Sequence, residues 1–306
     1  MMHLIQERAG HRTIERSPGP AQNGSEPATD RERVMALNEA LRARQRKPIA
    51  AERAPRPPAD MRPEEWQTRV DLAAAYRLAA IYGWTDLNNT HFSARIPGTE
   101  HFLLNPFGMF FDEITASSLI KLDKDGNLLG ESDYPSNPAG FVIHGAIHMS
   151  SPDLNWVIHT HSRFGTAVAT QRQGLLPVSQ KALTLMGWIA YHDFEGPATD
   201  IDERPRIVGD LGDKRILILR NHGLMTVGKT VGEAFVWMYR IETACRIQID
   251  ALAGGSELQP IAEATQRKSI EQGRRMYEPG GFIEAGKEWP ALLRQLERVD
   301  GTSYGR

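Results

Sequence analysis

The sequence predicts a mixed α/β domain built around a largely antiparallel sheet. Short β-rich runs at 90–95, 102–104 and 120–122 are joined by Gly, Pro and Asn turns, and strands connected by short turns pair antiparallel. A long amphipathic helix is predicted at about 231–252. With 306 residues, of which 41% are hydrophobic, the chain is long enough to bury a sizeable core.

The other predicted elements follow from local signals. Pro63 and the two glutamates after it are typical of the first turn of a helix, which we expect to end at Gly83. Further β-rich runs bounded by turn residues indicate strands, and three more segments have helical patterns. These strands are predicted at 156–161 and 215–219, and these helices at 140–149, 269–277 and 289–298.

Composition divides the chain into an extension and one domain. Residues 1–63 are rich in Pro, Arg, Glu, Gly and Ser and poor in aromatic and β-branched residues, so they cannot bury enough apolar surface to order themselves. We expect a flexible N-terminal extension at 1–63 and one domain at 64–275. Residues 276–306 are predicted to form a C-terminal tail with a short helix.

The charge balance narrows the classes of partner. The formal net charge is -2 and the isoelectric point is about 6.6, so no basic field favours nucleic acid or an anionic membrane surface. Small molecules or proteins remain as partners, and we expect a small-molecule substrate. The single cysteine, Cys245, cannot form an internal disulfide, and no secretory signal or long apolar run is recognisable. The expected location is therefore the cytoplasm.

Two histidines on a predicted strand form the first candidate metal-binding pair. His159 and His161 are two residues apart, and residues at that spacing on a strand point to the same face of the sheet. Two neighbouring imidazoles can chelate a borderline metal ion. A pair alone is a weak signal, because such histidines also occur without a metal.

A third histidine completes the candidate site. His222 follows the apolar strand predicted at 215–219 and precedes Gly223, which leaves room for a ligand or other backbone. Three imidazoles without a fourth protein ligand are typical of a catalytic zinc site, which keeps a position open. We expect one divalent metal ion per chain. Zn²⁺ is favoured, with Fe²⁺ as the alternative, because imidazole suits both ions.

His144 and His148 form a second pair, four residues apart on the predicted helix at 140–149. That spacing places both rings on one face and matches the two-histidine zinc helix of metalloproteases, but the intervening Gly145-Ala146-Ile147 lacks its glutamate. Supporting or packing roles are therefore favoured over direct metal ligation. His91, His101 and His192 are left without an assigned role.

Several motifs resemble the class II aldolase and adducin head-domain family, over about residues 66–258. The segment 152–162, which contains His159 and His161, resembles the first metal motif of the family, and 221–224 resembles its last. Three further segments resemble adducin and its bacterial relatives most closely. These are Asn105-Pro106-Phe107-Gly108, the segment 174–179 and the segment 190–196.

The resemblance implies a fold and a site. It implies a three-layer α/β/α sandwich with a central, mainly antiparallel sheet, and a homo-oligomer, commonly a tetramer with active sites near subunit interfaces. It also implies that His159, His161 and His222 bind zinc or a similar ion. Substrate would be bound around Asn105, Phe107, Gly108 and Gly140.

The sequence departs from the aldolase pattern at positions that contact substrate. The aldolases carry Ser-Ser-Glu where this chain has Pro138-Ala139-Gly140, so the catalytic glutamate is replaced by Gly140. Phe107 stands where a threonine is usual. A phosphate would lose its hydroxyl donors here, so we expect a small substrate without phosphate.

These observations predict a metal-dependent lyase that acts on a small hydroxy or keto carboxylate, by decarboxylation or aldol-type cleavage. A Lewis-acid metal would stabilise the enolate-like charge, and His144, one turn after Gly140, could supply the proton. Two alternatives stay open. The first is a three-histidine iron(II) oxygenase, and the second is an adducin-like, non-enzymatic module that binds cytoskeletal or other proteins.

Overall fold

The computed structural model describes residues 58–306 except 60, 199, 282 and 285, so most of the predicted N-terminal extension lies outside the described residues. The helices are α2 (Pro63–Tyr82), α3 (Pro138–Ser150), α4 (Arg163–Ala169), α5 (Gln180–Leu185), α6 (Arg204–Leu211), α7 (Val231–Ala253), α8 (Glu263–Tyr277) and α9 (Trp289–Val299), with short 3-10 turns η1 (Met186–Trp188), η2 (Ile201–Glu203) and η3 (Ser303–Gly305). The strands are β1 (His91–Arg95), β2 (Phe102–Leu104), β3 (Ile120–Leu122), β4 (Trp156–Thr160), β5 (Ile189–His192), β6 (Ile216–Leu219) and β7 (Gly223–Gly228).

The described strands form one seven-stranded sheet in the order β3-β2-β1-β4-β7-β6-β5. All neighbours pair antiparallel except β5 and β6, which are parallel. In the centre, β4 pairs with β1 on one side and β7 on the other, which places His91 opposite His159 and Leu224 opposite Thr160. The predicted mainly antiparallel sheet is confirmed.

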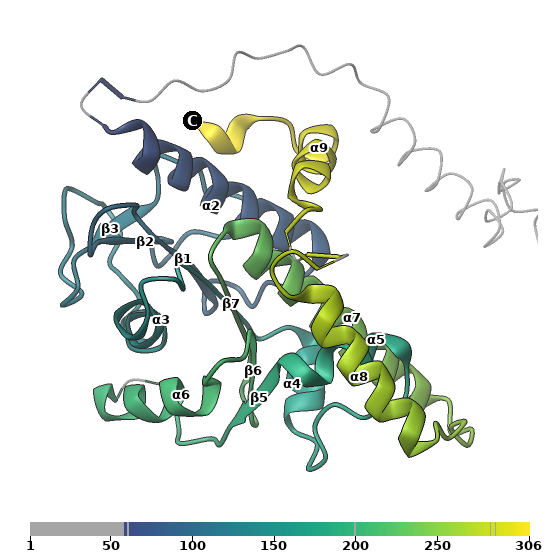
Figure 1. The fold of residues 1–306 in the computed structure, drawn as a ribbon. Helices are drawn as coiled ribbons and strands as arrows, with labels where there is room; N and C mark the ends of the chain where they lie inside the picture. Colours follow the sequence, from purple (N-terminus) through teal and green to yellow (C-terminus); the bar gives the residue numbers. More distant parts are fainter. Residues whose placement is uncertain (1–57, 60, 199, 282, 285) are drawn as a thin grey trace, which may run out of the picture. The chain divides into compact units, whose positions relative to one another are not determined.

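Helices cover both faces of the sheet, so the predicted three-layer α/β/α sandwich is also confirmed (Figure 1). On one face α2 and α7 pack over the strands, with Ile158 and Phe235 in one apolar cluster. On the other face α3 and α6 cover the strands, with Val157 and Ile147 in a second cluster. Residues alternate between the faces along β4, and His159 therefore lies on the α3 side.

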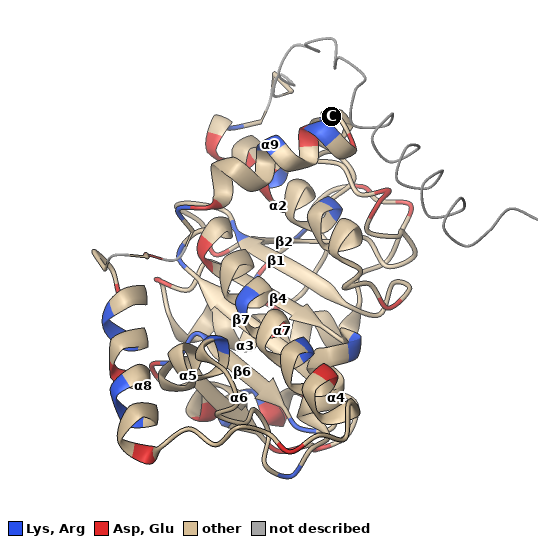
Figure 2. Ribbon diagram, turned by 90° about the vertical axis from the view of Figure 1, so that its right-hand side faces the viewer, with Lys and Arg blue, Asp and Glu red and all other residues tan. Residues whose placement is uncertain are grey.

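Lys and Arg residues are interspersed with Asp and Glu residues over the helices and loops around the sheet (Figure 2). The C-terminal segment contains α9, as predicted, and packs onto α2: Tyr82 Oη donates a hydrogen bond to Gln295, and Tyr304 is buried. No helix in the described part of the chain has the length and apolar character that crossing a membrane requires.

Candidate metal centre and active site

Three histidines meet at one end of the central strands. His159 lies near the end of β4, His161 follows that strand, and His222 directly precedes β7. Pairing of β4 with β7 brings these segments together. A Cβ atom at Gly223 would collide with the carbonyl oxygen of Thr160. The glycine therefore allows the His222 turn to approach β4, as the sequence pattern had suggested.

The Nε2 atoms of the three rings converge. Nε2 of His161 lies 3.0 Å from Nε2 of His159 and 2.9 Å from Nε2 of His222. One nitrogen from each residue lies within 4.8 Å of the others. Three imidazole nitrogens bound to one tetrahedral zinc at 2.0–2.1 Å would be separated by roughly 3.3 Å. The observed spacing is close to that value.

The outer nitrogens of two of these rings are held by acceptors. Nδ1 of His159 donates a hydrogen bond to the carbonyl oxygen of Leu224 at 3.0 Å, and Nδ1 of His161 donates to Oδ2 of Asp86 at 2.9 Å. Each donation leaves the Nε2 lone pair free to bind a metal ion. Asp86 belongs to the loop after α2, 75 residues before His161, and sequence reasoning did not identify it.

Burial favours the neutral form of His159 and His222, which is the protonation state that a metal ligand needs. Burial and the neighbouring His222 hold the pKa of His159 well below its usual range. Burial and the neighbouring His161 lower the pKa of His222 to about 4. Neutral imidazoles with converging lone pairs fit a divalent cation such as Zn²⁺ or Fe²⁺.

The residues predicted to bind substrate lie around the N-terminus of α3. A Cβ atom at Gly140 would lie 3.2–3.3 Å from the ring of His91 and the side chain of Leu104. Phe107 is 37% exposed, and its amide donates to the carbonyl oxygen of Pro135 at 2.9 Å. Gly108 has a φ of +123° and lies against the ring of Tyr134. The loop at 105–108 therefore contacts the segment that leads into α3.

Asn105, the fourth of these residues, is buried. Its Oδ1 accepts a hydrogen bond from Oη of Tyr76 at 2.8 Å, which fixes the amide from the α2 side. Its Nδ2 has no hydrogen-bond partner among the described residues. An unpaired buried donor is costly, and a ligand oxygen would satisfy it.

His144, the predicted proton donor, lies behind His91 and is completely buried. Its Nε2 is 2.7 Å from Nδ1 of His91, and its Nδ1 is 2.5 Å from Oγ of Ser93. Both ring nitrogens are therefore engaged within the protein. Sequence reasoning assigned no role to His91 or Ser93, because each is 50 or more residues from its partner on α3.

His192 is held in an environment of its own. Its Nδ1 is 2.7 Å from Oδ2 of Asp210, and its Nε2 is 3.2 Å from Oε1 of Glu203. Both nitrogens face carboxylates, so the ring does not extend the three-histidine cluster.

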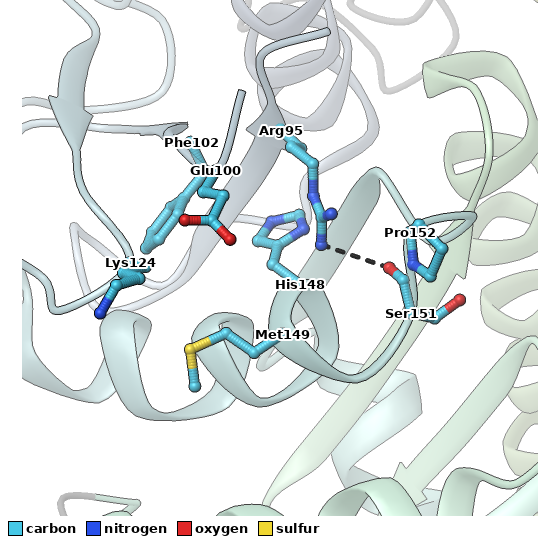
Figure 3. Close-up of a pocket in the computed structure, with 8 residues that line it drawn as sticks. All are labelled: Arg95, Glu100, Phe102, Lys124, His148, Met149, Ser151 and Pro152. Atoms are coloured by element: carbon cyan, nitrogen blue, oxygen red, sulfur yellow. Dashed lines mark hydrogen bonds between the residues drawn. The ribbon is translucent and has the colours of Figure 1, made fainter. Parts of the chain in front are cut away.

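A separate surface pocket lies at the C-terminal end of α3 (Figure 3). His148 lies in its wall, and the guanidinium of Arg95 crosses it to donate a hydrogen bond to the carbonyl oxygen of Ser151 at 3.2 Å. Glu100 and Lys124 add one charge of each sign. The pocket contains none of the three converging histidines.

The fold and the histidine cluster define an α/β/α protein with three converging imidazoles at one end of its sheet. The chain belongs to the class II aldolase and adducin family. The family profile described as "Class II Aldolase and Adducin N-terminal domain" matches residues 70–249. The resemblance recognised in the sequence motifs is thereby confirmed.

Individual relatives include bacterial proteins and adducins. A Caulobacter vibrioides protein named for the aldolase class 2 group is 50% identical over 239 residues, covering 76% of this chain and 90% of that protein. Alpha-adducin of Rattus norvegicus is 38% identical over 243 residues, covering 76% of this chain and only 33% of the adducin. The structure of L-fuculose 1-phosphate aldolase from Glaciozyma antarctica matches with a TM-score of 0.68 at 28% identity, covering 86% and 98% of the two chains.

Proposed function

We propose that this protein is a metal-dependent lyase that cleaves a carbon–carbon bond in a small hydroxy or keto carboxylate without a phosphate. The observation that carries the proposal is the convergence of Nε2 atoms from His159, His161 and His222, with no carboxylate among them. A divalent ion held there would act as a Lewis acid on adjacent substrate oxygens. Zn²⁺ is the favoured ion and Fe²⁺ the alternative.

The lining of the site supports a substrate without phosphate. Pro138, Ala139 and Gly140 begin α3, so the first turn of the helix carries no hydroxyl or charged side chain. Phe107 adds a partly exposed aromatic ring on the neighbouring loop. Phosphate recognition usually relies on hydroxyl, amide or cationic donors, and the Glaciozyma relative named for a sugar phosphate is only 28% identical.

The protein's own residues would orient the substrate. The buried Nδ2 of Asn105 is available to donate to a carboxylate or carbonyl oxygen. Phe107 and Gly108 would border the bound molecule on one side, and Gly140 lets the ring of His91 pack against the start of α3. Both ring nitrogens of His144 are engaged by His91 and Ser93, so we place it as support for His91 rather than in contact with substrate.

Metal content tests the first part of the proposal. Elemental analysis of anaerobically purified protein should find about one zinc or iron per chain, and His159→Ala and His222→Ala should each lose it. His101→Ala is the matched control, because His101 lies outside the cluster. An absence of bound metal, with none taken up on reconstitution, would contradict the enzyme proposal.

A substrate screen tests the second part. Protein loaded with zinc, and separately with iron(II), should release carbon dioxide or an aldehyde from one of a set of short hydroxy and keto acids, and should not act on their phosphorylated counterparts. Oxygen consumption that depends on iron(II) would instead assign the chain to the oxygenases. Cleavage of sugar phosphates alone would refute the substrate class.

An adducin-like binding role is the second candidate, because the chain is 37–38% identical to adducins over about 243 residues. In that case the chain would capture a protein partner at a fixed stoichiometry without needing the histidines. A triple alanine variant at His159, His161 and His222 that still folds and still binds its partner would favour this role.

The proposal includes a homo-oligomer in the cytoplasm, with a tetramer expected from the family resemblance. Exposed aromatic side chains support self-association, since Phe107, Phe110 and Tyr134 are 37%, 49% and 42% exposed. Light scattering coupled to size-exclusion chromatography would measure the molar mass. A monomer at micromolar concentration would contradict this part.

A further inference from the structure

A chain of buried polar side chains runs between α3 and the sheet. Nδ1 of His91 is 2.7 Å from Nε2 of His144, whose Nδ1 is 2.5 Å from Oγ of Ser93. The same Oγ is 2.6 Å from Nε2 of His148, and Nδ1 of His148 is 3.3 Å from the carbonyl oxygen of Leu154. All four side chains in this relay are at least 95% buried.

One end of the relay fixes the direction of every hydrogen bond in it. A carbonyl oxygen can only accept, so Nδ1 of His148 donates to Leu154. Nε2 of His148 then accepts from Oγ of Ser93, and that Oγ accepts from Nδ1 of His144. The opposite direction would place a lone pair of His148 against the carbonyl oxygen.

The fixed direction continues to His91. Because Nδ1 of His144 is protonated, its Nε2 must accept a hydrogen bond from Nδ1 of His91. A neutral imidazole carries one proton, so Nε2 of His91 has a free lone pair. All three rings are buried without a carboxylate partner in the relay, and such burial disfavours the charged form of an imidazole.

The ring of His91 is placed at the candidate active site. Its Cγ and Cδ2 atoms face Gly140, and Nδ1 faces His144, so Nε2 lies at the end of the ring farthest from β1. The ring centroid is 5.0 Å from that of the metal-site residue His159. Within the described residues, Nε2 of His91 makes no hydrogen bond.

The geometry points to His91 as a substrate-binding residue: its bare Nε2 accepts a hydrogen bond from the substrate, and Ser93, His144 and His148 are positioning residues that hold this tautomer. His91 occupies the space that a side chain at position 140 would enter. The absence of a side chain at Gly140 therefore allows the ring of His91 to lie where it does.

Because Nε2 of His91 can only accept a hydrogen bond, it favours a ligand that carries a hydrogen-bond donor. A 2-hydroxy acid presents a hydroxyl hydrogen beside its carboxylate, whereas the corresponding ether has none. The inference therefore narrows the substrate class to hydroxy acids, and in this respect it rests on the proposed function. The tautomer of His91 does not depend on that function.

Nitrogen NMR of protein labelled with ¹⁵N in its histidine rings tests the relay directly. In zinc-loaded protein, His91 should show a protonated Nδ1 and an unprotonated Nε2. Ser93→Ala should give mixed tautomers at His91 and His144, while Thr226→Val, which removes a buried hydroxyl bonded to Ala234, should not. A protonated Nε2 in the wild type would overturn the inference.

Ligand affinity tests the contact, with glycolate and its ether, methoxyacetate, as calorimetric probes of the zinc-loaded protein. The ether also chelates metal less well than glycolate does. The informative quantity is therefore the ratio of the affinity for glycolate to that for methoxyacetate, compared between the wild type and each variant. His91→Asn keeps a group near Nδ1 but removes Nε2, and should lower the preference for glycolate by about tenfold, the worth of one hydrogen bond. His91→Gln, whose amide oxygen can reach the position of Nε2, should retain much of it.

The outcomes separate the inference from the proposed function. If His91→Asn leaves the ratio of glycolate to methoxyacetate affinity unchanged, the hydrogen bond between the substrate and Nε2 of His91 is overturned, even if the enzyme proposal stands. Loss of zinc from His91→Asn, as in His159→Ala, would make His91 a metal ligand and overturn it as well. If wild-type protein binds neither probe, both the contact and the hydroxy-acid class fall, while the NMR result still decides the tautomer.

Discussion

Asp86 is the residue that orients His161 from outside the cluster. Its carboxylate accepts the Nδ1 proton of His161 at 2.9 Å, while Leu224 does the same for His159 through a backbone oxygen. A carboxylate both fixes the tautomer of a histidine and raises the basicity of its other nitrogen. A side-chain acceptor can be replaced by mutation, which makes its contribution measurable.

We therefore predict that Asp86→Asn weakens zinc binding by roughly 10- to 100-fold without unfolding the protein, because removing an outer partner of a metal ligand has an effect of that size. Competition with a coloured chelator would measure the affinity. Asp153→Asn serves as the control, since Asp153 pairs with Lys229 at the opposite end of β4. Equal affinities in all three proteins would show that Asp86 does not support the site.

Local spacing predicted the three converging histidines, but it could not predict their partners. His159 and His161 lie two apart on a strand, and His222 precedes a glycine after an apolar run. By contrast, Asp86, His91 and Ser93 reach the site only through contacts across 50 or more residues. No local period encodes such contacts. His144 was recognised as important, yet its burial behind His91 depends on how α3 packs on β1.

At the scale of elements, the site depends on the close approach of β7 to β4. Gly223 lies opposite Leu219 of β6 and beside the carbonyl oxygen of Thr160 on β4. Asn221, two residues earlier, has a positive φ of 56°, a conformation that Asn tolerates better than most residues. This turn presents His222 to the other two histidines.

We predict that Gly223→Ala lowers the free energy of unfolding by about 1–3 kcal/mol, because the added methyl group would force β7 away from β4. The same shift would separate His222 from His161, so zinc affinity should fall as well. Gly209→Ala in α6 is the matched control: its added Cβ meets no atom within 4 Å, and it should raise stability by roughly 0.5–1 kcal/mol. Urea denaturation would measure both, and a neutral Gly223→Ala would contradict the packing argument.

The elements that the sequence revealed are those with strong local patterns. The helix expected at 231–252 is α7, and the strand expected at 215–219 is β6. The short parallel strand β5 was not predicted, since its four residues carry no alternation that a strand of that length could display. Helix α4 was missed because Gly165 weakens its helical pattern; the glycine is needed where α4 packs against Leu224.

At the scale of the whole molecule, the two faces of the sheet differ in what they bury. The face under α2 and α7 is an apolar core. The face under α3 combines an apolar cluster with His91, Ser93, His144 and His148, which satisfy one another by hydrogen bonds. A buried polar network is tolerated only when each member has a partner. This arrangement links stability to pH.

The direction in which stability changes with pH follows from the depressed pKa values of these histidines. Burial lowers the pKa of His91 and that of His148 to about 3, whereas an unfolded histidine titrates near 6.5. Below pH 6.5 the unfolded chain binds protons that the folded protein excludes, so stability is greatest above that pH and is lost as pH falls toward 3. Between pH 7 and 5.5, each such histidine should lower the free energy of unfolding by about 1 kcal/mol.

Urea denaturation of the metal-free protein at several pH values between 7 and 5.5 would measure this loss. His148→Gln should reduce the slope of stability against pH by about one proton, because Gln can accept the hydrogen bond from Ser93 but does not titrate. Thr226→Val, which removes a buried hydrogen bond without an ionisable group, should lower stability equally at every pH. A slope unaffected by His148→Gln would mean that this histidine takes up its proton at the same pH in the folded protein as in the unfolded chain, and that its Nε2 is not held as the acceptor that the relay requires.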